Sequence, residues 1–263
     1  MVRIERVETL TRRAFEARYR ARGEPVVITG GLADWPALER WTPDYFARAL
    51  GDEVVEVNVN RGGVYDDNRR EPMRLGAYVD ELRAGETPRN SKYFTCDVDA
   101  VLPRLRDDYR FPPHIKREEG ARLHLFFGRD AKTGNHYHPW QQNTLAQIYG
   151  QKQVFLFEPG QFSRLDPEPF ADDRFNFSRG DFEELARQTP HAVVELQPGE
   201  MLFIPVHWWH GVLGEGMSIS AAFFWPASLE HYRFPEPGLR CIAKSPRKLA
   251  ESARALVRER LGR

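Results

Sequence analysis

The apolar residues of this chain change their spacing along the sequence, and from Lys92 onward they form short runs. Pro and Gly separate these runs at close intervals, which is typical of an all-β protein. Many runs are almost continuously apolar, as expected for strands packed between two sheets. The predicted strands span residues 92–96, 123–128, 144–149, 152–158, 192–196, 200–204 and 217–225. This pattern predicts an all-β jelly roll with flanking helices.

The N-terminal third has a mixed pattern of helices and strands. Leu10, Phe15 and Tyr19 stand among charged residues at the spacing of a short amphipathic helix. Thr42 followed by Pro43 is typical of a helix start. The expected elements are helices over 8–22, 42–51 and 74–84, strands over 24–31 and 54–59, and a charged, Gly-rich mobile loop over 61–71. We therefore expect N-terminal α/β elements before the barrel.

Two further segments are predicted outside the barrel. Residues 162–190 form a polar insertion with its own helix near 181–187. A C-terminal helix is expected to begin at Ser245 and to carry one apolar stripe, made of Leu249, Ala253, Leu256 and Leu261. A helix of this length must bury its stripe, either on its own barrel or against a second copy. We favour a two-fold homodimer through this helix.

No linker divides the chain, so residues 1–263 are predicted to form one domain. Its parts are helices and strands over 1–90, the barrel over 91–227 with its insertion, and a helical tail over 228–263.

The composition argues against a nucleic-acid or membrane partner. Lys+Arg and Asp+Glu both total 38, so no net field favours either partner. No run approaches the roughly 20 apolar residues that a membrane span needs. The charged start Met1–Arg6 is unlike a signal peptide. Cys96 and Cys241 are the only two cysteines and are far apart, which predicts a reduced, cytoplasmic protein.

Three histidines are the main candidates for chemistry. His136 and His138 stand two residues apart, and side chains at i and i+2 of a strand point to the same face. His210, in a second motif that starts at Pro205, can close a three-point face from a neighbouring strand. This layout is typical of a non-haem iron site, although one position there is usually a carboxylate. Three imidazoles also suit Zn(II) or Cu(II), so the sequence leaves all three metals open.

Several motifs resemble one enzyme family. They are Glu24–Gly30 with Asp34–Pro36 and Trp41–Thr42, then Gln141–Lys152, and finally Ile204–Pro205 with Trp208–His210. Their order and spacing resemble the cupin-like JmjC family, which contains Fe(II)- and 2-oxoglutarate-dependent hydroxylases on a double-stranded β-helix. The middle motif is similar to the asparaginyl hydroxylase that inhibits hypoxia-inducible factor. The resemblance covers residues 20–227, except the insertion over 162–190.

The resemblance implies that His136, His138 and His210 hold Fe(II). His138 falls where the family has a carboxylate, and in the alternative reading it is not a ligand. A neutral imidazole there would make the site more positive by one unit and would favour a dianionic co-substrate.

The resemblance also implies a pocket for the co-substrate 2-oxoglutarate. Lys152, Thr133 and Tyr93 match the residues that bind its distal carboxylate, and Asn143 matches a polar residue of the same pocket. A lysine inside an apolar barrel needs such a partner, because an unpaired buried ammonium is costly. Phe223 aligns with a second Asn of the family, so an apolar ring is expected in the pocket.

Aromatic residues near these motifs divide into two groups. Trp208 and Trp209 are expected in the core, as large aromatics usually are. Trp140, next to the histidine pair, is the candidate for substrate contact. His207 is expected to point away from His210 and to be structural.

We therefore predict an Fe(II)- and 2-oxoglutarate-dependent dioxygenase, a hydroxylase acting on a protein side chain or a small molecule. One alternative is a three-His cupin-type dioxygenase that does not use 2-oxoglutarate, in which Lys152 is dispensable. The other is a non-catalytic zinc-binding module.

Overall fold

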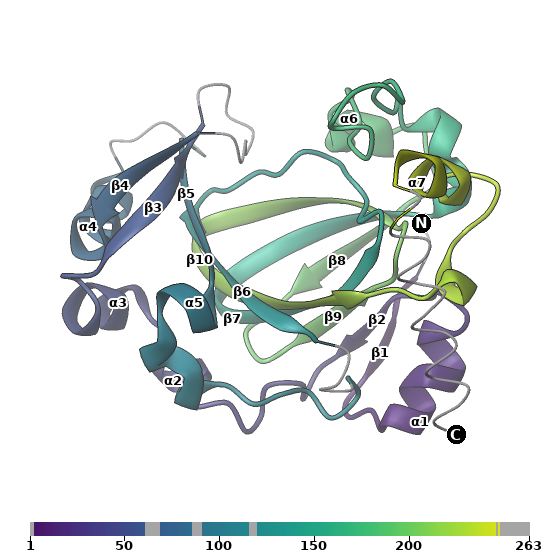
Figure 1. Cartoon of the computed structure of the whole chain (residues 1–263). Helices are drawn as coiled ribbons and strands as arrows, with labels where there is room; N and C mark the ends of the chain where they lie inside the picture. Colours follow the sequence, from purple (N-terminus) through teal and green to yellow (C-terminus); the bar gives the residue numbers. More distant parts are fainter. Residues whose placement is uncertain (1–2, 61–68, 86–90, 116–119, 246, 248–263) are drawn as a thin grey trace.

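The computed structural model describes residues 3–60, 69–85, 91–115, 120–245 and 247. Within this part of the chain ten strands form one curled sheet, shown in Figure 1, with the order β1-β2-β9-β7-β10-β6-β5-β3-β4 and β8 paired to β7. The strands are β1 (Glu5–Val7), β2 (Val26–Ile28), β3 (Val54–Val59), β4 (Arg70–Arg74), β5 (Lys92–Asp97), β6 (Arg122–Arg129), β7 (Gln141–Phe157), β8 (Ala192–Leu196), β9 (Met201–Ile204) and β10 (Trp209–Pro226).

The long strands β7 and β10 connect the two layers of the jelly roll. They pair antiparallel from Trp209↔Phe157 at one end to Pro226↔Gln141 at the other. The first half of β7 also pairs with β9, whereas its second half pairs with β8. The ladder changes register between the two halves, next to Gly150, whose φ is +66°. Each long strand therefore contributes one half to each layer.

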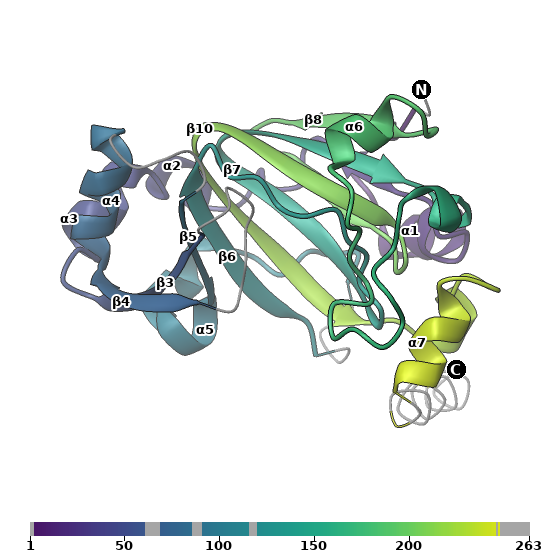
Figure 2. The same ribbon diagram turned by 90° about the horizontal axis from the view of Figure 1, so that it is seen from above.

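An irregular segment completes the smaller layer beside β10. Lys132 bridges to Leu213 and His136 bridges to His210, both antiparallel. The larger layer continues through β6 and β5 to β3 and β4. Figure 2 shows that β3, β4 and the helices α3 (Pro43–Ala49) and α4 (Leu75–Ala84) gather at one end of the molecule.

The remaining helices are short. They are α1 (Arg12–Phe15), which continues as a π-helical turn to Arg20, α2 (Ala37–Arg40), α5 (Val98–Val101), α6 (Phe182–Ala186) and α7 (Gly238–Lys244), with single 3-10 turns at 103–108, 159–164 and 229–231. No described helix is long and apolar enough to cross a membrane.

Three apolar clusters fill the spaces around the sheet. The largest lies between the larger layer and the N-terminal elements, and it includes Trp41 and Phe127. A second, with Leu156 and Ile204, draws on both halves of β7. The third packs the insertion and α7 on the smaller layer through Trp209.

Most sequence predictions of secondary structure are confirmed. Helices form at 12–20, 43–49, 75–84 and 182–186, and Thr42 caps α3 by accepting the N–H of Tyr45. All predicted strands are present, and the jelly-roll fold with flanking helices is confirmed.

The structure corrects three boundaries. The predicted strands 144–149 and 152–158 are one strand, because Gly150 bends β7 without ending it. The last strand begins at Trp209 rather than at residue 217. Residues 70–71, assigned to the loop, start β4, which pairs with β3. Ser245 follows the last residue of α7 as its C-cap, and Arg247 beyond it is helical. The predicted stripe over 249–261 and loop residues 61–68 lie outside the described residues.

Gly150 provides a test of the bend in β7. A Cβ at this position would lie 2.3 Å from the carbonyl oxygen of Met217, and its φ is positive. We expect Gly150→Ala to lower the free energy of unfolding by about 1–3 kcal/mol, because both strain and contact oppose it. Denaturant unfolding measures this change. Gly160→Ala is the matched control, since a Cβ there meets nothing within 4 Å, and an equal loss in both variants would contradict the prediction.

Candidate metal centre

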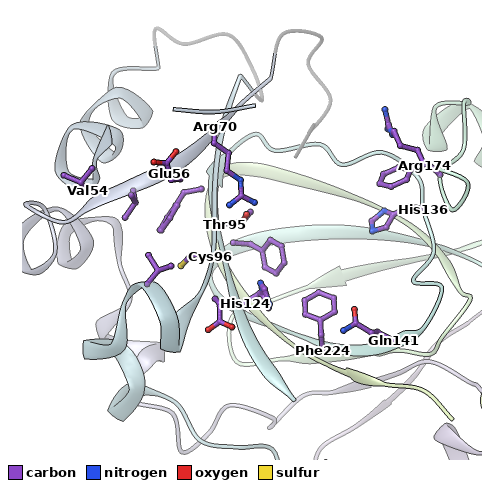
Figure 3. A pocket seen from close by; sticks show the side chains of 16 residues that line it. Val54, Glu56, Arg70, Thr95, Cys96, His124, His136, Gln141, Arg174 and Phe224 are labelled. Atoms are coloured by element: carbon purple, nitrogen blue, oxygen red, sulfur yellow. The ribbon is translucent and has the colours of Figure 1, made fainter. Parts of the chain in front are cut away.

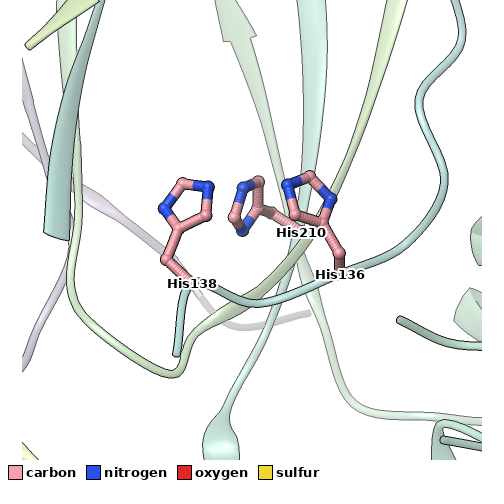
Figure 4. A group of neighbouring side chains, drawn as sticks. All are labelled: His136, His138 and His210. Carbon is pink, nitrogen blue, oxygen red and sulfur yellow. The ribbon is translucent and has the colours of Figure 1, made fainter. Parts of the chain in front are cut away.

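Three imidazoles, those of His136, His138 and His210, lie side by side, as Figure 4 shows. His136, His138 and His210 place their potential ligand nitrogens within 4.8 Å of one another. The ring centroids of His136 and His210 are 4.3 Å apart, and that of His138 lies 5.3 Å and 4.7 Å from them. This spacing suits a single ion bound by three side chains.

Backbone pairing positions two of these rings. The His136 N–H donates to the His210 carbonyl at 3.0 Å, and the His210 N–H donates to the His136 carbonyl at 2.7 Å. The pair is therefore fixed by the ladder rather than by side-chain packing alone. His138 follows two residues later, and its ring lies 5.2 Å from that of Phe224.

Hydrogen bonds orient the rings so that one nitrogen faces the centre. The Nδ1 of His136 lies 2.9 Å from the Gly134 carbonyl, and that of His210 lies 3.0 Å from the Trp208 carbonyl. A carbonyl can only accept, so Nδ1 carries the proton in both rings and Nε2 keeps its lone pair for a metal.

Asn143 lies beside the third ring. Its Nδ2 is 3.4 Å from the Nδ1 of His138, and its Oδ1 has no partner among the described residues. A 180° rotation of the Asn143 side-chain amide would exchange Oδ1 and Nδ2. His138 Nδ1 would then face an oxygen acceptor, as the other two rings do.

Burial keeps the three imidazoles neutral. It lowers the pKa of His136, and together with neighbouring histidines it lowers the pKa of His138 to about 3 and that of His210 well below its usual value. Neutral imidazole is the form that binds a metal, so no proton has to leave these rings at neutral pH.

A small cavity of about 140 Å³ extends from the histidines into the barrel. Its lining joins the three imidazoles with the residues that the sequence assigned to a co-substrate: Tyr93, Thr133, Asn143 and Lys152. Lys152 is 2% exposed, and its Nζ donates to Ser220 Oγ at 2.6 Å and to Tyr93 Oη at 3.2 Å. No carboxylate among the described residues forms an ion pair with it. Burial lowers its pKa to about 7.

Two features shape the polar end of this cavity: the space beside the Tyr93 ring and the hydroxyl of Thr133. Gly128 lies opposite Tyr93 on the next strand, and a Cβ there would come within 2.5 Å of the tyrosine ring. Thr133 Oγ1 accepts the Val212 N–H at 2.9 Å, which leaves its own proton to donate. The cavity thus offers donors at its closed end and candidate metal ligands at its open end.

A larger groove of about 800 Å³ lies outside the histidines (Figure 3). One wall comes from β3, β4 and β5, including Glu56, Arg70 and Asp97, and the other includes Gln141 and Arg174. His136 and three aromatic rings line both the groove and the inner cavity: Phe126, Phe177 and Phe224. We call these three rings the aromatic collar.

The structure differs from the sequence reading at two aromatic positions. Phe223, expected in the pocket, points to the opposite face of β10 and packs with Trp35 and Phe111. Phe224 occupies the cavity instead, because alternation along β10 brings it to the same face as Ala222. Trp140, expected to contact substrate, packs near Phe175 in the third cluster and lines neither cavity.

The core assignments agree with the structure. Trp208 and Trp209 are buried. The His207 ring hydrogen-bonds to the Pro139 carbonyl and to the Arg233 N–H, which gives it a structural role.

Sequence reasoning missed Ser220, Arg174 and Phe177. Ser220 had a signal, since a polar residue two positions before Ala222 on an apolar strand faces the same interior. Arg174 and Phe177 belong to the insertion, which the resemblance left out. Only tertiary structure brings them to the site.

Comparisons with known proteins identify a matching family model and similar sequences. The family model described as the cupin-like domain matches residues 12–231. The chain is 28% identical over 241 residues to lysine-specific demethylase JMJ30 of Arabidopsis thaliana, covering 87% of this chain and 56% of that protein. It is 26% identical to Jumonji C domain-containing protein 5 of Drosophila melanogaster, covering 83% and 57%. It is 25% identical to human tRNA wybutosine-synthesizing protein 5, covering 84% and 77%. The chain thus spans little more than half the length of the first two relatives.

Lys152 is expected to destabilise the protein while its cavity holds no anion. Its pKa is about 7 in the folded protein against 10.5 for an ordinary lysine, so the unfolded chain binds more protons between these pH values. Stability should therefore be lowest below pH 7 and should rise with pH through this window. We expect Lys152→Met to raise the free energy of unfolding at pH 6 by about 1–4 kcal/mol, with the gain fading toward pH 10.5.

Thermal unfolding at several pH values, without added ligand, measures this gain. Lys132→Met is the matched control, because Lys132 is paired with Asp181 and Glu183. A stability of Lys152→Met equal to or below that of the wild type at pH 6 would contradict the prediction.

Proposed function

Because the chain belongs to the cupin-like domain family, we propose that it is an Fe(II)- and 2-oxoglutarate-dependent oxygenase. When bound, Fe(II) and 2-oxoglutarate supply the oxidising chemistry: one atom of O2 enters a substrate C–H bond, and 2-oxoglutarate loses CO2 to give succinate. The relatives named as a lysine-specific demethylase and as a Jumonji C domain-containing protein support this class.

The burial of Lys152 beside the three histidines is the observation that carries the proposal. Lys152 is a buried ammonium without an ion-pair partner among the described residues, in the same cavity as three converging imidazoles. Such a charge is costly unless an anion binds it. A carboxylate reaching in from a metal would supply that anion, as the far end of 2-oxoglutarate does.

The donor count fits one carboxylate group. An ammonium has three N–H donors, and Tyr93 and Ser220 accept two of them. The third N–H and the Thr133 hydroxyl are left for the ligand. The role of this side chain set is to bind and orient the co-substrate in a water-poor site.

The histidine triad fits Fe(II) without a carboxylate ligand. His136 and His210 are oriented by carbonyls, and His138 stands beside Asn143. With three neutral ligands the metal keeps its full charge of two, which strengthens the attraction of a dianionic co-substrate. The same triad suits Zn(II) or Cu(II), so metal analysis of the purified protein belongs with every test below.

The two alternative functions leave the buried lysine of the cavity unexplained. A three-His dioxygenase without 2-oxoglutarate, or a zinc module, has no role for a buried lysine with donors aimed toward the metal. The buried charge of Lys152 therefore favours the 2-oxoglutarate enzyme.

Three finer parts remain proposals. We propose a substrate that is a protein side chain or a small molecule, a cytoplasmic location, and a homodimer through the C-terminal helix. Free, buried Cys96 and Cys241 support a reduced compartment. The oligomeric state in solution is the property that bears on the dimer.

The first experiment is an anaerobic titration of the Fe(II)-loaded protein with 2-oxoglutarate. We expect the weak visible charge-transfer band of a chelated 2-oxo acid. Lys152→Met should weaken 2-oxoglutarate affinity about tenfold to a hundredfold, because it removes a charge-assisted hydrogen bond. Lys132→Met is the control. Equal affinity in wild type and Lys152→Met would favour an enzyme that does not use 2-oxoglutarate.

The second experiment tests the ligands by metal affinity. Substituting His136 or His210 by Ala should lower Fe(II) affinity by more than the roughly 10–100-fold lost with an outer-shell partner. His138→Ala should do the same, whereas His138→Asp should retain iron through its carboxylate. His207→Gln is the control outside the triad. Unchanged affinity in His138→Ala would remove that residue from the ligand set.

A further inference from the structure

The groove outside the metal centre has one wall with an unbalanced positive charge. Arg174 lines that wall beside His136 (Figure 3), and no carboxylate among the described residues forms an ion pair with its guanidinium. The opposite wall carries Glu56, Asp97 and Arg70, whose charges partly offset one another.

Arg174 is held by a stack that ends on a candidate metal ligand. Its guanidinium carbon lies 4.5 Å from the centroid of the Phe177 ring. The Phe177 ring in turn stacks on His136, with centroids 5.1 Å apart and an angle of 16° between the planes. Stacking covers one face of the guanidinium and leaves its edge donors in the groove, where a carboxylate or phosphate can pair with two of them.

The backbone of the insertion fixes this stack to the metal segment. The Tyr137 N–H donates to the Asn176 carbonyl at 3.0 Å, and the Asn176 amide donates to the Tyr137 carbonyl at 2.9 Å. The Ser178 N–H donates to the Asn135 carbonyl at 2.9 Å. The position of Arg174 relative to the histidines is therefore set by a short ladder, even though the side chain is exposed.

The passage from the groove to the inner cavity is apolar. The aromatic collar and His136 are the residues common to both linings. A substrate that reaches the metal must therefore pass a short hydrocarbon portion between these rings, since an uncompensated polar group would lose its water there.

We propose that the substrate of this enzyme has an anionic head group, a carboxylate or a phosphate, joined to a short apolar chain. Arg174 binds the head group in the groove, and the aromatic collar receives the chain so that a C–H bond faces the metal. This inference rests on the proposed function for its chemistry, but the binding site in the groove stands on Arg174 and the collar alone.

The test uses matched probes and the Zn(II)-loaded protein saturated with 2-oxoglutarate, which does not turn over. Hexanoate, hexyl phosphate and uncharged hexanamide share the same chain length and differ in the head group. In calorimetric titrations, hexanoate or hexyl phosphate should bind wild type about tenfold more tightly than hexanamide. Arg174→Ala should remove that advantage and leave hexanamide binding unchanged.

Arg179→Ala is the matched control, because Arg179 is an exposed arginine of the same insertion that is paired with Asp166. Arg174→Lys should restore part of the affinity, since it keeps the charge but loses the paired donors. The tighter of the two anionic probes identifies the head group. Equal binding of charged and uncharged probes to wild type, or anion binding that Arg174→Ala does not weaken, would overturn the proposal.

Repeating the titration in Lys152→Met separates this inference from the oxygenase proposal. Loss of 2-oxoglutarate binding with retained, Arg174-dependent hexanoate binding would place the anion site in the groove. Hexanoate binding that disappears with Lys152 would place it in the inner cavity and would refute the role of Arg174. Failure of the wild type to bind 2-oxoglutarate would reject the oxygenase proposal without touching the groove site.

Discussion

The pairing of β7 with β10 along their whole length is the constraint on which the rest of the structure depends. Each strand crosses from one layer to the other, so residues far apart in sequence reach one cavity from both layers. His210 comes from the start of β10 and Ser220 from its second half, while Lys152 comes from the second half of β7. The cavity therefore exists only when both halves of the ladder have formed.

The same pairing explains how the site keeps its histidines in place without a carboxylate. The irregular segment before β7 attaches to the edge of β10 through reciprocal hydrogen bonds between His136 and His210. Two ring orientations then follow from nearby carbonyls. A candidate ligand set held by the backbone in this way is preorganised, so little conformational entropy would be lost on binding an ion.

Stability and the proposed role of Lys152 act in opposite directions at the closed end of the cavity. Lys152 is buried with hydroxyl partners rather than an anion. Its burial lowers its pKa, and its charged form lowers the free energy of unfolding. A methionine would fill that space at lower cost, so packing alone does not account for a lysine there. The insertion contributes Arg174 and Phe177, which line the groove outside the histidines.

The sequence by itself determined the fold class, the three histidines and the lysine, because each depends on short-range signals. The two-residue spacing of His136 and His138 predicts that they face one side, Thr42 and Pro43 start a helix, and apolar runs between Pro and Gly mark the strands. The tertiary structure decided what depends on register and on distant pairing. The ladder of β7 and β10 shifts by one residue between Ile219↔Tyr149 and Ser220↔Gln147, which brings both Asn143 and Lys152 to the cavity although nine positions, an odd number, separate them. Register also turns Phe224 inward in place of Phe223 and sends Trp140 into a core cluster, and the fold of the insertion brings Arg174 to His136. No local pattern encodes these outcomes, because a shift of one residue reverses the face of every side chain that follows it.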